Sequence, residues 1–188
     1  KNISLFHEIA SHGLSHNHPI TIDTLTKSKQ IINDIIIDSI KGFRAPRWDI
    51  KDIKIVERAG FLYDSSTHPI FLPTKYNNLN QKRTIHKINN LIEIPLSTLP
   101  PNFSLFWLAF KNAPLQYAKV FTKINFIKNN YTMLVFHPWE FTNINKFSIP
   151  SYIKQNNGIN LLNKLESYII FCKEKGYSFK TIKDFLKK

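Results

Sequence analysis

Four apolar residues near the start of the chain are spaced so that they fall on one face of a helix. They are Leu25, Ile32, Ile35 and Ile36. This pattern predicts a helix from about residue 25 to residue 39. The pair Asp23-Thr24 precedes the stretch and offers side chains suited to capping its N-terminus.

Helical patterns also occur later in the chain. They cover residues 53–59, 105–127, 161–175 and 181–186. Gly60 and Gly176 directly follow two of these stretches, and glycine ends helices because it adopts a left-handed backbone conformation at low cost. Thr181 can cap the last helix.

Short apolar stretches between these helices predict strands at residues 43–44, 61–63, 91–95, 132–136 and 177–179. Residues 132–136 form the clearest strand pattern, bounded by asparagines and a proline. Residues 69–90 contain several breakers and predict mostly loop. The alternation of helices and strands predicts an α/β architecture with a parallel sheet, in a single domain over residues 1–188. Residues 35–37 and 134–135 are expected to be core.

Length and composition are typical of a globular domain. The chain has 188 residues, of which 43% are hydrophobic and 21% are charged, and this is enough for a sizeable core. Its apolar runs are far shorter than a transmembrane helix needs, and no secretory signal pattern is visible. Localisation therefore stays open between the cytoplasm and the cell envelope. Cys172 is the single cysteine, which excludes an internal disulfide.

The formal net charge is +13, which suits an anionic partner such as an acidic polysaccharide or a membrane surface. The lysines are spread along the whole chain instead of being gathered in one basic run with interleaved aromatic residues. This distribution argues against nucleic acid as the partner.

Polar residues with chemical potential lie close to several predicted strands. His12 and His16 are four residues apart, so their imidazoles can face the same way and bind one metal ion. The alternative is that both are ordinary polar residues of a turn. Arg44 and His137 each end a predicted strand, which is where parallel α/β sheets build their sites. Asp64 also follows a strand, and its expected role is to cap the next turn.

Five blocks of the chain, in order, resemble a known family. The chain is similar to the metal-dependent polysaccharide deacetylases, the NodB-homology or carbohydrate esterase group, and most of all to a branch associated with exopolysaccharide synthesis. Residues 8–16 resemble the family's His-x-x-x-His metal motif, and residues 42–46 resemble its Arg-x-Pro motif. Residues 136–140 resemble its C-terminal histidine motif. Residues 60–66 and 92–99 are similar to further blocks of that branch.

The resemblance implies a deformed (β/α) barrel, a divalent metal such as zinc, and hydrolysis of N-acetyl groups on an amino-sugar polysaccharide or oligomer. It also implies roles for particular residues. These are His12 and His16 as metal ligands, Arg44 as the partner of the base carboxylate, the N–H of Arg47 as an oxyanion donor, His137 as the general acid, and Trp139 and Glu140 as the frame of the acetyl pocket.

One family motif has no counterpart in the sequence. It is an Asp-Asp pair that supplies the general base and the third metal ligand, whereas the first aspartate here is Asp23. The chain starts with Lys1 and its only methionine is Met133. We therefore expect an N-terminal portion, with the first βα unit of the barrel, to precede Lys1. Without that portion we expect the chain to be inactive or nearly so.

Two other functions stay open. The chain can be a non-catalytic or degenerate relative that binds carbohydrate with part of the site. It can also belong to the related group that hydrolyses small cyclic amides, such as allantoin, on a similar barrel. A polymer-length groove favours the deacetylase, and a closed small pocket favours the cyclic-amide hydrolase.

Overall fold

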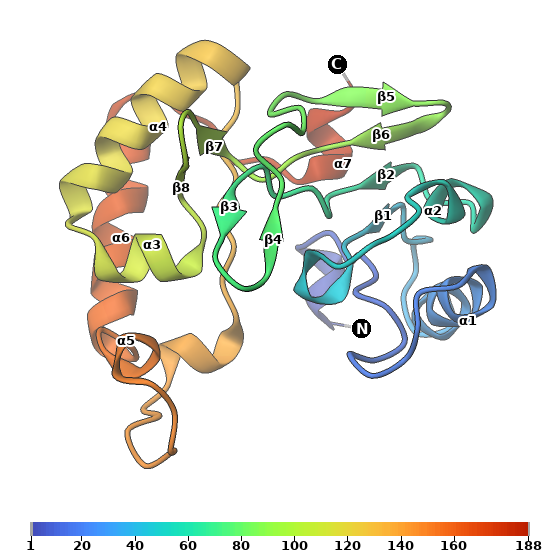
Figure 1. Ribbon diagram of the computed structural model, residues 1–188, viewed down its shortest axis with the longest axis horizontal. Coiled ribbons are helices and arrows are strands. Elements are labelled where there is room, and N and C mark those ends of the chain that lie inside the picture. The colour runs from blue at the N-terminus through green and yellow to red at the C-terminus, as the bar shows by residue number, and fades with distance from the viewer. Residues whose placement is uncertain (1, 188) are drawn as a thin grey trace. The chain divides into compact units, whose positions relative to one another are not determined.

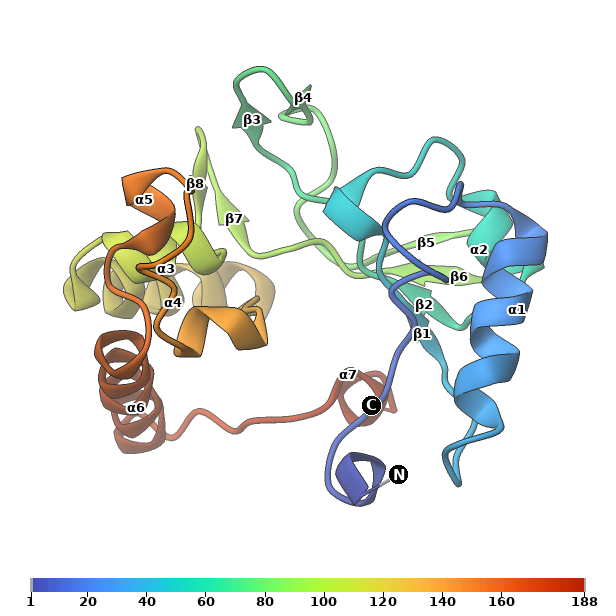
Figure 2. The ribbon, with the colours of Figure 1, turned by 90° about the horizontal axis from the view of Figure 1, so that it is seen from below.

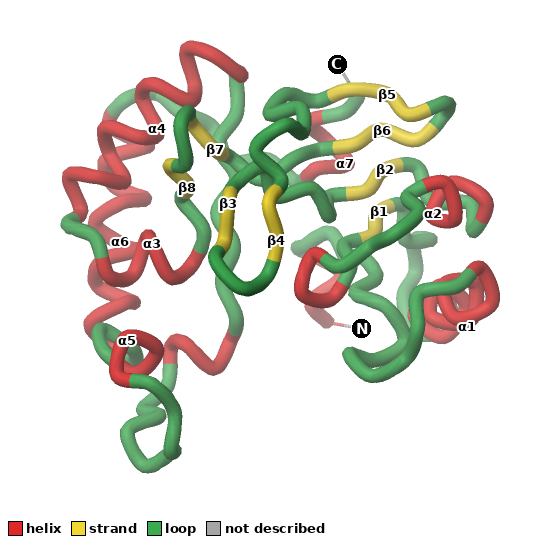
Figure 3. The backbone as a smooth tube through the Cα atoms, viewed as in Figure 1, coloured by secondary structure: helices red, strands yellow, loops and turns green. Residues whose placement is uncertain are grey.

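The computed structural model describes residues 2–187 and contains two compact units. The first unit takes in residues 2–68, 80–95 and 180–187, and the second takes in residues 69–79 and 96–179. Helices and short strands are mixed along the chain (Figure 3). The mixed α/β class is thus as expected, while the deformed barrel and the single-domain organisation stay predictions.

A four-stranded sheet forms the centre of the first unit (Figure 1). Its order is β1 (Gly42–Phe43), β2 (Tyr63–Asp64), β6 (Leu91–Glu93) and β5 (His86–Ile88). The first three strands are parallel, and β5 is antiparallel to β6. The register pairs Asp64 with Glu93, so these two side chains emerge next to each other from neighbouring strands.

Two helices pack beside this sheet, α1 (Ile22–Asn33) and α2 (Lys54–Arg58) (Figure 2). The buried apolar residues of the first unit form one cluster, which comprises Leu25, Ile40, Phe43, Ala45, Val56, Ala59, Phe61 and Leu91. Gly60 ends α2 with φ of +74°, as the sequence predicts. The strand expected at residues 91–95 is present as β6.

The helix predicted over residues 25–39 is wrong at both ends. Its N-cap is Thr21, whose side chain accepts from the N–H of Thr24, and the helix ends at Asn33. The side chain of Asn33 accepts a hydrogen bond from the N–H of Ile40 at 2.9 Å, which stabilises the chain as it leaves the helix. Ile35 and Ile37 are consequently 56% and 74% exposed, so the prediction that they are core residues is wrong.

Short helical turns occur at both ends of the first unit. The 3-10 turn η1 covers Asn2–Leu5, and the final helix α7 covers Ile182–Phe185. Thr181 caps α7 by accepting from the N–H of Asp184, as predicted. A third turn, η2 (Pro46–Trp48), follows β1.

The second unit is mainly helical. It contains α3 (Trp107–Asn112), α4 (Leu115–Asn129), α5 (Ser151–Lys154), α6 (Ile159–Glu174) and the 3-10 turn η3 (Pro138–Phe141). The single helical segment predicted over residues 105–127 is divided at Pro114, which has no N–H to continue a helix. The buried core residues are Leu99, Leu105, Phe110, Ala118, Phe121, Leu161, Tyr168, Phe171 and Cys172.

The strand predictions of the second unit are mostly wrong. Residues 132–136 make one isolated bridge, between Phe106 and Val135, and Figure 3 draws this stretch as loop. Side chains take over the backbone bonds there: the N–H of Met133 donates to Oγ of Ser97 at 2.8 Å, and Asn125 donates to the carbonyl of Tyr131 at 2.5 Å. Within the part of the chain that the structure describes, residues 177–179 form no strand.

The stretch predicted as loop over residues 69–90 contains three short strands. They are β3 (Phe71–Leu72), β4 (Tyr76–Asn77) and β5. The first two pair with each other in an antiparallel ribbon, and β7 (Thr98–Leu99) and β8 (Phe103–Ser104) form a second ribbon. Pro73 lies in the turn between β3 and β4, whereas Asn77 belongs to β4 itself and Asn78 directly follows it.

Candidate functional site

The histidine pair of the first unit lies next to the parallel sheet. Ser11 bridges Phe43 in the parallel direction, and His12 directly follows it. Gly13 has φ of +82°, a conformation that glycine adopts readily, and it turns the chain close to Pro46. The ring centroids of His12 and His16 are consequently only 5.1 Å apart, with the ring planes at 72°.

One hydrogen bond sets the tautomer of the neutral His12 ring. Its Nδ1 lies 2.8 Å from the carbonyl oxygen of Arg44. A carbonyl only accepts hydrogen bonds, so Nδ1 carries the hydrogen and the lone pair of the neutral ring is on Nε2. This arrangement is typical of metal-binding histidines, which usually donate from the other ring nitrogen.

The donor set of this pair fits part of a metal site. Two neutral imidazoles whose rings are this close can each provide one nitrogen to a zinc-like ion. Across residues 2–187, however, no group of three or more His, Cys, Asp or Glu side chains is arranged to hold a metal ion. The role of His12 and His16 as metal ligands therefore stays a prediction.

Arg44 follows β1 and is half-buried. Its Nε donates to the carbonyl of Ser65 and its Nη2 donates to Oγ of Ser65, both at 2.8 Å. Burial lowers the pKa of the Arg44 guanidinium, while the nearby Asp64 charge acts in the opposite direction. Arg44 is thus held by the strand-end loop that follows β2, and it is not a plain surface residue.

The turn after Arg44 has a rare backbone conformation. Arg47 and Trp48 have φ of 57° and 58°, values that side-chain-bearing residues seldom adopt. Such conformations persist where surrounding bonds fix them and are frequent at functional sites. Here the N–H of Ala45 donates to Oγ of Ser66 at 2.8 Å. The N–H of Arg47 is in the first turn of η2, where N–H groups have no partner within the helix.

Two buried carboxyl groups hold the loop that contacts this turn. Asp64 and Glu93 are both 0% exposed. Asp64 accepts from the hydroxyl of Ser66 at 2.7 Å and from its N–H at 2.8 Å, which is the turn-capping role predicted for it. Glu93 accepts from the N–H of Thr67 at 2.9 Å.

The two carboxyl groups also hydrogen-bond to each other. Burial and the adjacent Asp64 charge raise the pKa of Glu93 to about 9, and burial also raises the pKa of Asp64. Two carboxylates this close do not both ionise readily, so the pair retains a proton near neutral pH. Sequence reasoning did not select Glu93, and the only signal was its place in a block similar to the family.

His68 is a second residue that the sequence did not single out. It is 0% exposed and its ring centroid lies 4.9 Å from that of Trp48, so it is a buried residue, although its polar ring and lack of a motif suggest a turn or surface position. Burial, together with the Arg44 charge, lowers the pKa of His68 to about 3. The ring is therefore neutral at ordinary pH.

The other predicted residues lie in the second unit. His137 directly precedes η3, and its Nδ1 is 2.7 Å from Oε1 of Glu140. The same carboxylate oxygen accepts from the backbone N–H of His137 at 2.8 Å. Glu140 is 0% exposed, so one buried carboxylate fixes both the ring and the backbone of this histidine.

Two indoles flank the His137 side chain, which is 41% exposed. Trp139 stacks on it, with centroids 5.4 Å apart and planes at 20°, and Trp107 meets it edge-on at 5.7 Å. Lys111 is 1% exposed, and its Nζ is 4.9 Å from the Trp107 ring centroid and 5.9 Å from that of Trp139. The buried lysine thus supports both tryptophans, a role that the sequence did not predict.

His12 and His16 belong to one compact unit and His137 belongs to the other. A single site that contains all three stays a prediction, as do the roles assigned to Arg44, Arg47, Trp139 and Glu140.

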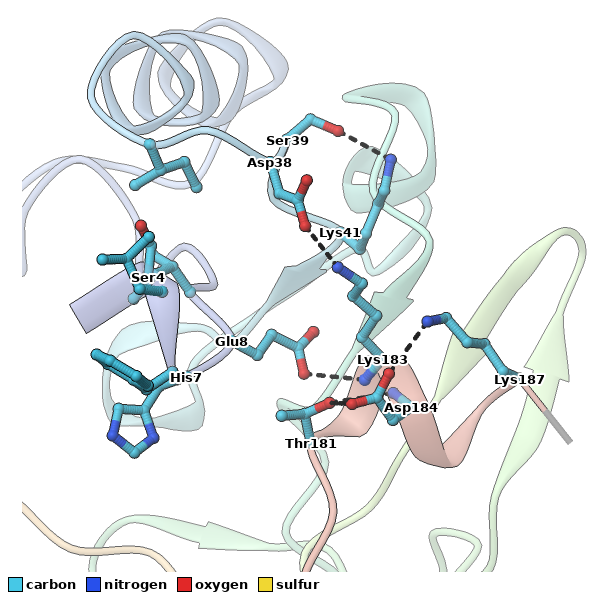
Figure 4. A pocket seen from close by; sticks show the side chains of 14 residues that line it. Ser4, His7, Glu8, Asp38, Ser39, Lys41, Thr181, Lys183, Asp184 and Lys187 are labelled. Atoms are coloured by element: carbon cyan, nitrogen blue, oxygen red, sulfur yellow. Dashed lines mark hydrogen bonds and ion pairs between the residues drawn. The ribbon is translucent and has the colours of Figure 1, made fainter. Parts of the chain in front are cut away.

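The first unit contains a cavity of about 260 Å³ (Figure 4). Some of the residues that line it lie a few positions before the histidine pair in the sequence. Its walls come from residues 4–9, residues 36–41 and α7. Lys183 pairs with Asp38 at 2.7 Å, and Lys187 pairs with Asp184 at 3.1 Å. Glu8 accepts from the Tyr63 hydroxyl and from the N–H of Lys183. These groups neutralise one another and tie α7 to the sheet.

Comparison with known proteins adds one partial similarity. No protein-family model matches the chain. Over 76 residues it is 36% identical to a peptidoglycan deacetylase of Helicobacter pylori. Part of the chain is therefore similar to a deacetylase. The alignment covers 36% of this chain and 26% of that protein, so the match spans about a quarter of the relative's length.

Within residues 2–187, no helix has both the length and the apolar character that a membrane span requires.

Proposed function

We propose that this chain is a polysaccharide deacetylase domain, a metal-dependent hydrolase that removes N-acetyl groups from an amino-sugar polymer. The observation that carries the proposal is the His12–His16 pair, in which the Arg44 carbonyl sets the metal-binding tautomer of His12. The partial similarity to a peptidoglycan deacetylase supports the same reaction class. The resemblance of five ordered blocks supports the branch associated with exopolysaccharides.

In this proposal the residues of the first unit bind and orient. His12 and His16 hold the divalent ion, with zinc as the proposed metal. A bound ion of this kind polarises an acetyl carbonyl and lowers the pKa of a water molecule. The N–H of Arg47 donates to the carbonyl oxygen as negative charge develops on it. The buried Asp64–Glu93 pair and Ser66 keep the Arg47 turn in its rare conformation.

In this proposal the residues of the second unit transfer a proton to the departing amine. Nδ1 of His137 is bound to Glu140, so Nε2 is the atom that delivers a proton to the departing amine. Trp139 and Trp107 limit the access of water to this ring. Glu140 keeps the imidazole in one orientation.

The proposal also predicts a low rate for the chain. No three-ligand metal group occurs within residues 2–187, and the Asp-Asp pair that supplies the family's general base has no counterpart in the sequence. General-base catalysis contributes about 10²–10⁴-fold to such reactions. We therefore expect slow release of acetate.

A direct test combines metal binding with acetate release from N-acetylated chito-oligosaccharides. We expect zinc-dependent release that disappears in the His12→Ala and His16→Ala variants and is retained in the control His86→Ala. His86 bonds the carbonyl of Thr84 within its own strand region and has no place in the proposal. Release that is equal in all four proteins would contradict the proposed function.

A second candidate is a non-catalytic carbohydrate-binding relative. The observation that favours it is the same lack of a three-ligand group within the described chain. It predicts that the protein binds the acetylated glycan and releases no acetate, with or without zinc.

A further inference from the structure

The second unit contains a cavity whose walls are rich in carboxamide side chains. Its volume is about 380 Å³, within the range of small-molecule sites. The carboxamide residues that line it are Asn143, Asn145, Gln155, Asn156, Asn157 and Asn160. Lys154 is the only charged residue of the lining, and Ile144 and Ile159 are its aliphatic residues.

We propose that this cavity is a binding subsite for an N-acetylated amino sugar of a glycan. The inference rests on the proposed function for the identity of the polymer, and it assigns to residues 143–160 a role in binding sugar, separate from the chemistry of His12, His16 and His137.

Asn157 is the residue that points most directly to a ligand. Its Oδ1 accepts from Nζ of Lys111 at 2.7 Å. An ammonium group only donates, so this contact fixes which end of the carboxamide is oxygen and which is nitrogen. The Nδ2 group is buried and, within residues 2–187, has no hydrogen-bond partner. A buried donor without a partner costs free energy, and an acceptor on a bound ligand would remove that cost.

The remaining walls favour a neutral, hydroxyl-bearing ligand. A carboxamide both donates and accepts hydrogen bonds, as a sugar hydroxyl does, whereas an anion only accepts. The single lysine of the lining already donates to the carbonyl of Asn145 at 3.4 Å. Ile144 and Ile159 add apolar surface for the C–H face of a sugar ring. The acetamido carbonyl of an N-acetylated sugar is an acceptor suited to Nδ2 of Asn157.

Residues of the cavity wall contact the residues that hold His137 in place. The N–H of Gly158 donates to the carbonyl of Glu140 at 2.8 Å. Nζ of Lys111 contacts Asn157 on one side and lies over the rings of Trp107 and Trp139 on the other. Gly158 in the cavity wall is therefore linked to His137 through Glu140, which bonds both residues. This is the arrangement expected of a subsite that holds one unit of a polymer while a neighbouring unit approaches His137.

The test is direct binding of triacetylchitotriose to the chain, measured by calorimetry with a metal chelator present. The decisive variant is Asn157→Asp, which keeps the oxygen that accepts from Lys111 and replaces the Nδ2 donor by an acceptor. We expect it to weaken binding by about tenfold or more. The matched control is Asn163→Asp, which makes the same charge change at an exposed position of α6 outside the lining, and it should bind as the parent does.

Two further measurements keep the proposal falsifiable if Asn157→Asp fails to fold. Asn160→Ala removes an exposed carboxamide of the lining and should weaken binding by about threefold. Cellotriose has hydroxyls but no acetamido group, so it should bind the parent about tenfold more weakly than triacetylchitotriose. Equal binding by the parent and the folded variants would overturn the proposal, and so would a parent that does not bind triacetylchitotriose.

The chelator separates this inference from the proposed function. Sugar binding by the parent, together with no acetate release from the parent when zinc is supplied, would refute the deacetylase activity and leave the subsite standing. Acetate release that is unchanged in Asn157→Asp and Asn160→Ala, with unchanged binding, would refute the subsite and leave the activity standing.

Discussion

The two units hold their histidines in place with different groups. In the first unit, Asp64 and Glu93 accept from Ser66 and from backbone N–H groups of the strand-end loops, and His12 donates to a backbone carbonyl, that of Arg44. In the second unit, the buried carboxylate of Glu140 bonds the ring of His137 itself. His12 and His16 are exposed, whereas His137 is partly enclosed by two indoles.

Under the proposed function, this difference suits two kinds of chemistry. A carbonyl partner holds an imidazole in one neutral tautomer, which is the form that binds metal. A carboxylate partner can bond a ring that carries one proton or two, which suits a group that transfers a proton. The first unit thus builds a rigid backbone frame and leaves its histidines accessible, and the second unit fixes the histidine directly.

The largest expected effect is on the free energy of unfolding, and it comes from removing the Glu140 carboxylate that bonds His137. Glu140→Ala leaves the ring and the N–H of His137 without their shared acceptor, and buried groups that lose a partner are costly. We expect the free energy of unfolding to fall by about 3 kcal/mol in urea denaturation. His12→Ala should change it by less than about 0.5 kcal/mol, as expected for an exposed side chain. Equal losses would show that the two histidine groups are supported alike.

The second largest expected effect is a change of stability with pH, which arises from the buried Asp64–Glu93 pair of the first unit. Because the pKa of Glu93 is raised from its ordinary value of 4.5 to about 9, the folded protein binds this proton more tightly than the unfolded chain does. The resulting stabilisation is fully present below about pH 4.5 and is lost as the pH rises toward 9. Glu93→Gln stays uncharged and should abolish this loss.

The measurement is urea denaturation between pH 7 and pH 9 for the parent and for Glu93→Gln. This range lies above the titration of His68, whose lowered pKa affects stability only as the pH falls below 6.5. We expect the parent to lose on the order of 1 kcal/mol per pH unit more than the variant. Parallel curves would mean that Glu93 is ionised in the folded protein throughout.

Zinc binding tests the accessible histidines. His12→Ala and His16→Ala should each weaken zinc binding by about tenfold, or about 1.4 kcal/mol, because each removes one of two nitrogen ligands. His137→Ala should leave zinc affinity unchanged, and calorimetric titration gives all three values. Loss of zinc binding in His137→Ala would assign the metal to the second unit and reverse the comparison.

The smallest effect is the coupling between His137 and Trp139. Their rings are stacked, so a double-mutant cycle with His137→Ala and Trp139→Ala should give an interaction of about 0.5–1 kcal/mol. The corresponding cycle for His12 and His16 should give a value near zero, since both rings are exposed to solvent. Urea denaturation of each set of four proteins provides the numbers.

Features governed by nearby residues could be predicted from the sequence. Gly60 and Gly176 follow their helices with positive φ, and Thr181 caps α7, because one or two residues decide these endings. Asp64 caps the Ser65-Ser66 turn for the same local reason. The four-residue spacing of His12 and His16 sufficed to bring their rings close, since a single loop carries both.

Only the tertiary structure decided which polar groups are buried and what they contact. Glu93 and His68 are as polar as any surface residue in sequence, and they became buried because neighbouring strands and loops closed over them. Residues 132–136 have the composition of a strand, yet the N–H of Met133 donates to the side chain of the distant Ser97, and the stretch makes one isolated bridge, at Val135. Lys111 acquires its role from Asn157 and Trp139, far along the chain, and from Trp107 in its own helix. Local patterns fix backbone turns because few dihedral angles are involved, whereas burial and partnership depend on contacts between segments that no local pattern encodes.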